Sequence, residues 1–229
     1  MSLEPKRLAV VLLTIGISVA SLFFFKDKPW SNGNTAAGLL AVNSILFALC
    51  GVWWRDAAIG RLAVFGAAFG LVELIADALC VGITKTLTYA PAHSTMIWLS
   101  PWWMPGAWAI VAMQIGYLGS ALTRKFGLVR GAVLCSMIGA VNIPFYEEMA
   151  YHAHWWAYRS CRMAGHTPIY IIVAEMIIGA ALAPLARRVL DTPSMETALK
   201  AGLIAGTSTI FGGLIGYGSI EVVLKNAMR

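Results

Sequence analysis

Charged residues are scarce in this 229-residue sequence. Only 12% of the residues are Asp, Glu, Lys or Arg, while 59% are hydrophobic. An average soluble domain is about one quarter charged. Long apolar runs recur along the chain, and a helix needs about 20 residues to cross the hydrocarbon core of a membrane. The composition therefore argues against an ordinary soluble domain and predicts one integral membrane domain over residues 1–229.

The sequence also lacks a basic stripe and a cysteine motif. Its net charge is +6, but the basic residues are scattered singly and in pairs, which argues against a nucleic-acid-binding protein. The four cysteines show no CxxC or metal-type spacing. Cys50, Cys80 and Cys135 lie inside apolar runs, where cysteine behaves as a small hydrophobe. We expect no disulfide framework.

The apolar runs predict an all-α fold, a polytopic transmembrane bundle of about seven helices. The expected helices are 8–25, 35–54, 62–84, 102–122, 128–146, 167–186 and 198–220. Thr192, Pro193 and Ser194 predict the restart of the last helix. Prolines are expected at helix ends, where a missing N–H costs little: Pro101, Pro105, Pro144 and Pro168. Two connections, 85–101 and 147–166, are long, and long connections often carry function.

The distribution of lysine and arginine predicts the orientation of the bundle. They are more frequent near the N-terminus and in the loops 55–61, 123–130 and 187–200 than on the opposite side. Since basic loops stay in the cytoplasm, we expect the N-terminus to be cytoplasmic, in a bacterial inner membrane. The connection 147–166 would then face the exoplasmic side.

Three acidic residues fall inside predicted helices. Glu73 and Asp77 are four residues apart and share one helix face, and Glu175 is expected near mid-membrane. Ionisable groups at this depth are costly and usually functional. Two carboxyl groups that close together cannot easily both ionise, so one of the pair should keep a proton, as a general acid requires.

Gln114 and Asn142 add polar groups at similar depths. The pattern predicts a buried polar cavity that opens to the outer side. For Gln114 and Asn142 the alternative is a structural hydrogen bond between helices.

Aromatic residues gather beside the two long connections, in "WLSPWWMPGAW" and "HAHWWAY". An aromatic wall can bind a large apolar ligand and stabilise a cation. The alternative is the aromatic belt found at membrane interfaces. The predicted wall residues are Trp102, Trp103, Trp108, Tyr146, Trp155 and Trp156.

Histidine is scarce, with four residues in all. Glu147, Glu148, His152 and His154 offer possible metal ligands. The chain has no HExxH motif and too few histidines for a membrane di-iron oxygenase, so we expect no metal and no cofactor. A proton relay or an interfacial role for these histidines stays open.

Two stretches carry a resemblance to a known architecture: "FGLVELIADALCVGITKTLTYAP", followed by "WLSPWWMPGAW", and "WWAYRSCRMAGHTPIYIIVAE". Their layout over about 70–180 resembles that of membrane carotenoid hydratases and cyclases and, more loosely, of the seven-helix terpene cyclases of meroterpenoid pathways. The likeness is one of arrangement, and we expect a separate bacterial family that shares it. Val72 stands where those terpene cyclases have Trp before Glu, and DDxxD is absent.

The resemblance implies a reaction. Such enzymes protonate an alkene or epoxide of a long isoprenoid, hold the carbocation against aromatic rings, and finish by losing a proton or adding water. It implies Glu73 as the acid beside Asp77, and Glu175 or Glu148 as the final proton acceptor. The substrate would enter from the bilayer.

Two other functions use the same features. A proton-coupled transporter would use the carboxyl groups as a relay and needs access from both sides. A non-catalytic subunit of a membrane complex would show large apolar outer faces and no cavity. An oligomer is compatible with all three readings.

Overall fold

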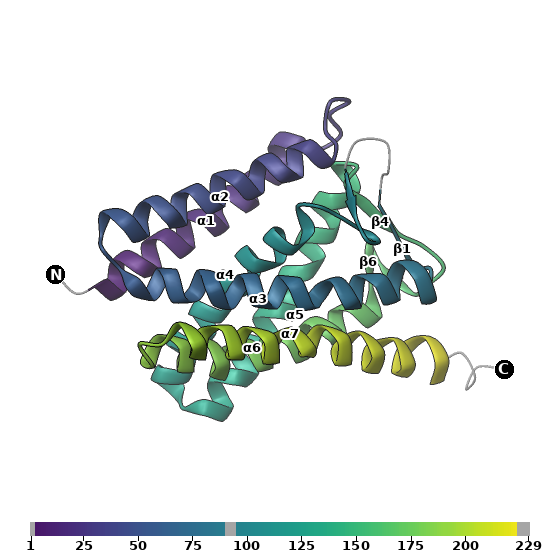
Figure 1. Ribbon diagram of the computed structural model, residues 1–229. Helices are drawn as coiled ribbons and strands as arrows, with labels where there is room; N and C mark the ends of the chain where they lie inside the picture. Colours follow the sequence, from purple (N-terminus) through teal and green to yellow (C-terminus); the bar gives the residue numbers. More distant parts are fainter. Residues whose placement is uncertain (1–2, 90–94, 224–229) are drawn as a thin grey trace.

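The structure is a computed structural model that describes residues 3–89 and 95–223, and over these ranges it is an all-α bundle, as predicted (Figure 1). The long helices are α1 (Leu3–Phe25), α2 (Gly33–Trp53), α3 (Ala57–Ala78), α4 (Met104–Phe126), α5 (Leu128–His152), α6 (Ile169–Asp191) and α7 (Met195–Tyr217). Helix α3 continues into a π-helical turn, Leu79–Ile83, and α7 into another, Gly218–Val223.

Among the described residues, six of these helices are long and apolar enough to cross a membrane, so the chain is integral to the membrane. The remaining helix, α4, has 23 residues but a less apolar composition. It packs against α1, α2, α3, α5 and α6. A helix surrounded by protein needs fewer lipid-compatible side chains, which accounts for its composition.

Short polar side chains begin several helices. The Asn32 side chain accepts a hydrogen bond from the Asn34 N–H at 2.9 Å and starts α2. Asp56 caps α3 in the same way. Ser194 accepts from the Thr197 N–H at 3.1 Å, which confirms the predicted restart before α7.

The end of α5 differs from the prediction. The helix runs on to His152, so Pro144 lies inside it and not at its end. Proline removes one backbone hydrogen bond and bends a helix without necessarily ending it, because neighbouring helices can hold the segment in place. The predicted connection 147–166 therefore begins as helix.

The two long connections pair with each other. Strand β1 (Leu87–Tyr89) is antiparallel to β4 (Trp156–Tyr158), with Thr88 opposite Ala157. Two small hairpins lie beside them, β2 (Met96–Ile97) with β3 (Ser100–Pro101), and β5 (Met163–Ala164) with β6 (Thr167–Pro168). The labelled strands gather at the end of the bundle away from the N-terminus (Figure 1). We call this end the outer end.

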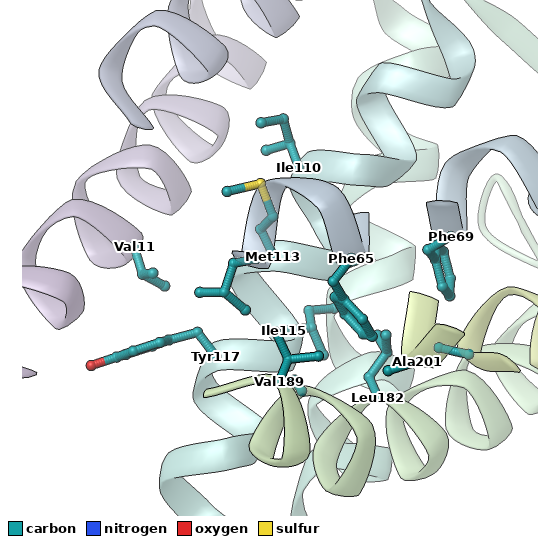
Figure 2. Close-up of a cluster of buried hydrophobic side chains, with 14 of the residues drawn as sticks. Val11, Phe65, Phe69, Ile110, Met113, Ile115, Tyr117, Leu182, Val189 and Ala201 are labelled. Carbon is teal, nitrogen blue, oxygen red and sulfur yellow. The ribbon is translucent and has the colours of Figure 1, made fainter. Parts of the chain in front are cut away.

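Two clusters of buried hydrophobic side chains fill the molecule. The first occupies the part of the bundle nearer the N-terminus, where Phe65 of α3 and Leu182 of α6 lie beside Ala201 of α7 (Figure 2). The second lies at the outer end and joins β1, the start of α4 and the end of α5.

Glycine allows α5 and α6 to approach closely. A Cβ atom on Gly139 would overlap the backbone carbonyl oxygen of Glu175. This contact places α5 against α6 at the level of a predicted site carboxyl group.

Candidate active site

A cavity of about 100 Å³ lies between the α1–α2 hairpin, α4, α5 and the β1–β4 pair. Three carboxyl groups from three different helices line it: Asp77 of α3, Glu147 of α5 and Glu175 of α6. Its aromatic lining consists of Tyr89, Trp103, Trp108, Tyr146, Trp155, Trp156 and Tyr158. Of the four predicted catalytic carboxyl groups, Asp77 and Glu175 therefore lie at one aromatic hollow, together with Glu147.

Asp77 is held by groups from the outer segments. Its Oδ2 atom accepts hydrogen bonds from the Tyr89 hydroxyl and, at 2.7 Å, from the Ser100 hydroxyl. All three residues are buried, with Asp77 6% exposed. The donors fix the carboxyl group of Asp77 at the cavity wall.

Glu73 lies one helical turn before Asp77 and stands behind it. The two carboxyl groups are in hydrogen-bonding contact, while the Glu73 Oε2 atom has no partner in the described part of the chain. A hydrogen bond between two carboxyl groups requires a proton, so this contact forms a bond only when one of the two is protonated. Glu73 is 2% exposed and does not line the cavity, whereas Asp77 does.

The other two carboxyl groups differ in their partners. Glu147 Oε2 accepts a hydrogen bond from the indole N–H of Trp156 at 2.7 Å. Glu175 is 3% exposed, and no residue of the described ranges donates to its carboxyl group. Glu175 is therefore free to contact a molecule inside the cavity.

Two phenols from the outer strands complete the polar lining. Burial raises the pKa of Tyr89 well above its usual value, and the nearby Asp77 raises it further. Burial, followed by the charge of Glu147, does the same to the pKa of Tyr158. Both phenols keep their protons at physiological pH, so they act as hydrogen-bond donors.

The indole of Trp156 is the centre of the aromatic wall. Its ring lies 6.2 Å from Trp103, 6.1 Å from Trp155 and 6.4 Å from Tyr89, measured between centroids. The Trp155 N–H donates to the Thr35 hydroxyl at 2.9 Å, which ties the wall to α2. These spacings are typical of interacting aromatic pairs.

The cavity ends toward the N-terminal side of the bundle at Ile110 and Val111. Ile110 also belongs to the first hydrophobic cluster, which continues beyond it through Met113 and Phe65 (Figure 2). In the part of the chain that the structure describes, the first hydrophobic cluster therefore borders the cavity on this side.

Most of the predicted substrate-binding residues line the cavity, namely Trp103, Trp108, Asn142, Tyr146, Trp155 and Trp156. Trp102 does not, because it lies in the turn before α4 with 48% of its surface exposed. Gln114 is buried three residues beyond Val111, outside the lining, with its Nε2 unpaired within the described residues.

The neighbours Glu147 and Glu148 separate. Consecutive residues on a helix point about 100° apart, so Glu147 enters the cavity while Glu148 turns to the outside and contacts His152 and His166. Glu148 is therefore not placed to accept a proton from the cavity.

The predicted set of metal ligands is also divided. Glu147 faces the cavity, and His154 is exposed in the turn after α5. Glu148 and His152 do meet, but their third partner is His166. Sequence spacing alone identifies neither His166 nor the roles of Tyr89 and Ser100, because β-pairing and hairpin turns bring these residues in.

A family model described as a domain of unknown function, DUF6989, matches residues 74–220. The chain belongs to this family. No curated protein and no solved structure matches it. The DUF6989 match contains Asp77, Glu147 and Glu175, and it begins one residue after Glu73. It leaves out α1 and α2, which form one wall of the cavity.

Proposed function

We propose that this DUF6989 protein is a membrane enzyme that cyclises or hydrates an isoprenoid lipid by protonating one of its alkenes. One observation carries the proposal: carboxyl groups from α3, α5 and α6 line a single aromatic cavity inside a membrane bundle. Intramembrane carboxyl groups are costly and usually functional, and aromatic faces stabilise cations. The likeness in layout to carotenoid hydratases and cyclases points to the same chemistry.

The acid at the cavity wall is Asp77 in this proposal, with Glu73 as the hydrogen-bonding partner of its carboxyl group. The resemblance implied Glu73 as the acid and Asp77 as its neighbour, but of these two residues only Asp77 lines the cavity. Asp77 gives its proton to an alkene carbon, and the electron pair of the double bond forms the new C–H bond. The Glu73–Asp77 pair is then left without that proton, and it regains one when the proton released in the last step passes back to it.

The resulting carbocation lies against the indoles of Trp103 and Trp156, which stabilise it by about 0.5–2 kcal/mol for each ring face. The carbocation can be quenched in two ways. The cation loses a proton to Glu175 or Glu147 and forms a new alkene, or it takes up water, whose proton passes to one of these carboxylates.

The size of the cavity bears on the substrate. About 10–15 Å³ of such space holds one water molecule, so about 100 Å³ takes the reacting end of an isoprenoid and not a whole long polyene. The rest of the chain would lie toward the bilayer, beside the α1–α2 hairpin. An enzyme embedded in the membrane can take up such a substrate directly, because an isoprenoid lipid dissolves in the bilayer and not in water.

The alternatives have less support. A transporter needs a route to both sides, and within the described residues the first hydrophobic cluster borders the cavity on the N-terminal side of the bundle. A purely structural subunit gives no reason for carboxyl groups around a hollow. We also propose that the N-terminus is cytoplasmic in a bacterial inner membrane, on the distribution of basic residues.

The test compares lipid extracts from cells that express the wild type, Asp77→Asn or Glu175→Gln. Mass spectrometry should show an isoprenoid product with the wild type, reduced by about 10²–10⁴-fold without the acid. Glu196→Gln is the matched control, because Glu196 is exposed and pairs with Lys200 on the same helix, away from the cavity. Identical lipid profiles for wild type and Asp77→Asn, at equal protein levels, would refute the proposal that this protein is an isoprenoid-converting enzyme.

A further inference from the structure

A second cluster of polar side chains lies outside the cavity, at the outer end of α5. Glu148 Oε1 is 2.9 Å from His152 Nε2, and Glu148 Oε2 is 2.6 Å from His166 Nδ1. One carboxyl group and two imidazole nitrogens thus converge, all within 4.8 Å of one another. The proposed reaction uses none of these residues.

The backbone holds each of the three groups in place. Glu148 and His152 are four residues apart on α5 and therefore share a face. His166 follows Gly165, whose φ of +62° makes the tight turn between β5 and β6. The His166 ring stacks on Tyr151 with centroids 3.6 Å apart, which fixes its orientation.

A fourth group orients one of the imidazoles. Asp27, in the α1–α2 connection, places Oδ1 2.7 Å from the Nδ1 atom of His152. Its backbone N–H also donates to the His152 carbonyl oxygen at 3.0 Å. A carboxylate on the far nitrogen of a histidine is the arrangement that metal sites use to fix the ring and raise its basicity.

We propose that Glu148, His152 and His166 bind one divalent transition-metal ion of the zinc type. Two imidazoles and a carboxylate form the donor set that zinc accepts when it keeps an open position for water. The Glu148 and His166 side chains are 41% and 34% exposed, so an ion can enter from outside. On binding, the ion takes the place of the protons in the two short contacts, which are released.

The ion would join three segments that are distant in sequence: the α1–α2 connection through Asp27, the end of α5, and the β5–β6 hairpin. Glu148 is next to Glu147, which lines the cavity. Occupancy would therefore stabilise the outer wall of the cavity. The proposal depends on these contacts alone and stands apart from the proposed reaction.

The experiment titrates Zn²⁺ into the purified full-length chain in detergent after treatment with a chelator, using a competing fluorescent zinc indicator. The wild type should bind one Zn²⁺ per chain, and excess Mg²⁺ should not displace it, since Mg²⁺ prefers oxygen ligands. His166→Ala should abolish this binding. Asp27→Asn should weaken it by about 10–100-fold.

Two further variants separate a metal site from a hydrogen-bond network. Glu148→Gln keeps the shape and can still contact both imidazoles, because its oxygen accepts from one ring and its NH2 group donates to the other. It should therefore preserve the melting temperature without zinc and lose the zinc-induced rise. His154→Ala is the control, because His154 is nearby in sequence but outside the cluster. Absence of saturable zinc binding by the wild type, or equal affinity in wild type and Glu148→Gln, would overturn the proposal.

Discussion

At the scale of single residues, the account depends on how Asp77 is held. Its Oδ2 atom accepts from Tyr89 and Ser100, and both donors come from the outer segments and not from α3. The carboxyl group that faces the cavity is therefore oriented by residues that join it only in the folded protein.

Tyr89→Phe tests this arrangement. The ring keeps its packing, but Asp77 loses a hydroxyl donor. Asp77 becomes charged as it gives up its proton, and a hydrogen bond to a charged group contributes about 1.5–3 kcal/mol. Product formation should fall by about 10–100-fold while the melting temperature changes little. Tyr217→Phe is the control, because its ring is half-buried on α7, away from the cavity. Full activity of Tyr89→Phe would show that Asp77 needs no such donor.

The sequence predicts part of this site at the residue scale. Four-residue spacing places Glu73 and Asp77 on one helix face, and their contact follows. The spacing does not reveal which of them faces the cavity, because that depends on how α3 is rotated in the bundle. The same holds for Glu147 and Glu148. The packing of α5 decides that Glu147 points into the cavity and Glu148 points away from it.

At the scale of elements, close helix contacts position the carboxyl groups. Gly139→Ala should force α5 away from α6, because its Cβ would overlap the Glu175 carbonyl oxygen. We expect a loss of about 1–3 kcal/mol in unfolding free energy, measured by thermal unfolding in detergent. Gly213→Ala should be neutral or slightly stabilising, since nothing lies within 4 Å of its added Cβ. Equal effects of the two substitutions would contradict the packing described.

The start of α3 gives a prediction about pH. Arg7 Nε and an Nη atom donate to the two Asp56 oxygens at 2.6 and 2.8 Å. Burial acts to raise the pKa of Asp56, but these bonds and the Ala58 N–H outweigh it and leave the pKa below its usual value. A lowered carboxyl pKa stabilises the fold above the unfolded-state pKa of about 3.9, and this contribution is lost as pH falls through the folded-state value.

Asp56→Asn isolates that contribution, because asparagine caps a helix as well as aspartate does. At pH 7 the variant should be less stable than the wild type by about 1–3 kcal/mol. The difference should shrink as the pH falls below about 4. Thermal unfolding in detergent at several pH values measures it, and a constant difference across this range would exclude the ion pair as its cause.

The positions of the helices were easier to predict than the residues at which they end or the pairing of the segments that connect them. Apolar runs identified the seven long helices found in the described ranges, since long runs leave few other structures in a membrane. Pro144 suggested the end of α5, but tertiary contacts keep the helix intact to His152. The β1–β4 pair has three residues in each strand, too few to show an alternating pattern, so it emerges only when the two connections meet.

For the molecule as a whole, the seven long helices of the described residues place the start of α1 and the end of α7 on opposite sides of the bundle (Figure 1). With the N-terminus in the cytoplasm, a reporter enzyme that is active only outside the cytoplasm should work when fused to the C-terminus. Fusion at the loop near Asp56 should leave it inactive. Activity in the reverse pattern would invert the proposed orientation and place the outer end in the cytoplasm.

The composition predicted that the whole molecule is an integral membrane protein. The cavity could not be predicted in the same way, because it depends on how the helices pack in the folded protein. Carboxyl groups of α3, α5 and α6 come together because α4 fills the centre of the bundle and the α1–α2 hairpin closes one side. No local pattern contains that arrangement.

The most direct test of the central claim follows the proton itself. Membranes that contain the wild type or Asp77→Asn are incubated with an isoprenoid lipid extract in D₂O, and the products are analysed by mass spectrometry. Protonation of an alkene at the cavity predicts a product with a carbon-bound deuterium in the wild type and none in Asp77→Asn. A wild-type product without carbon-bound deuterium, or deuterium uptake unchanged in Asp77→Asn, would contradict the account.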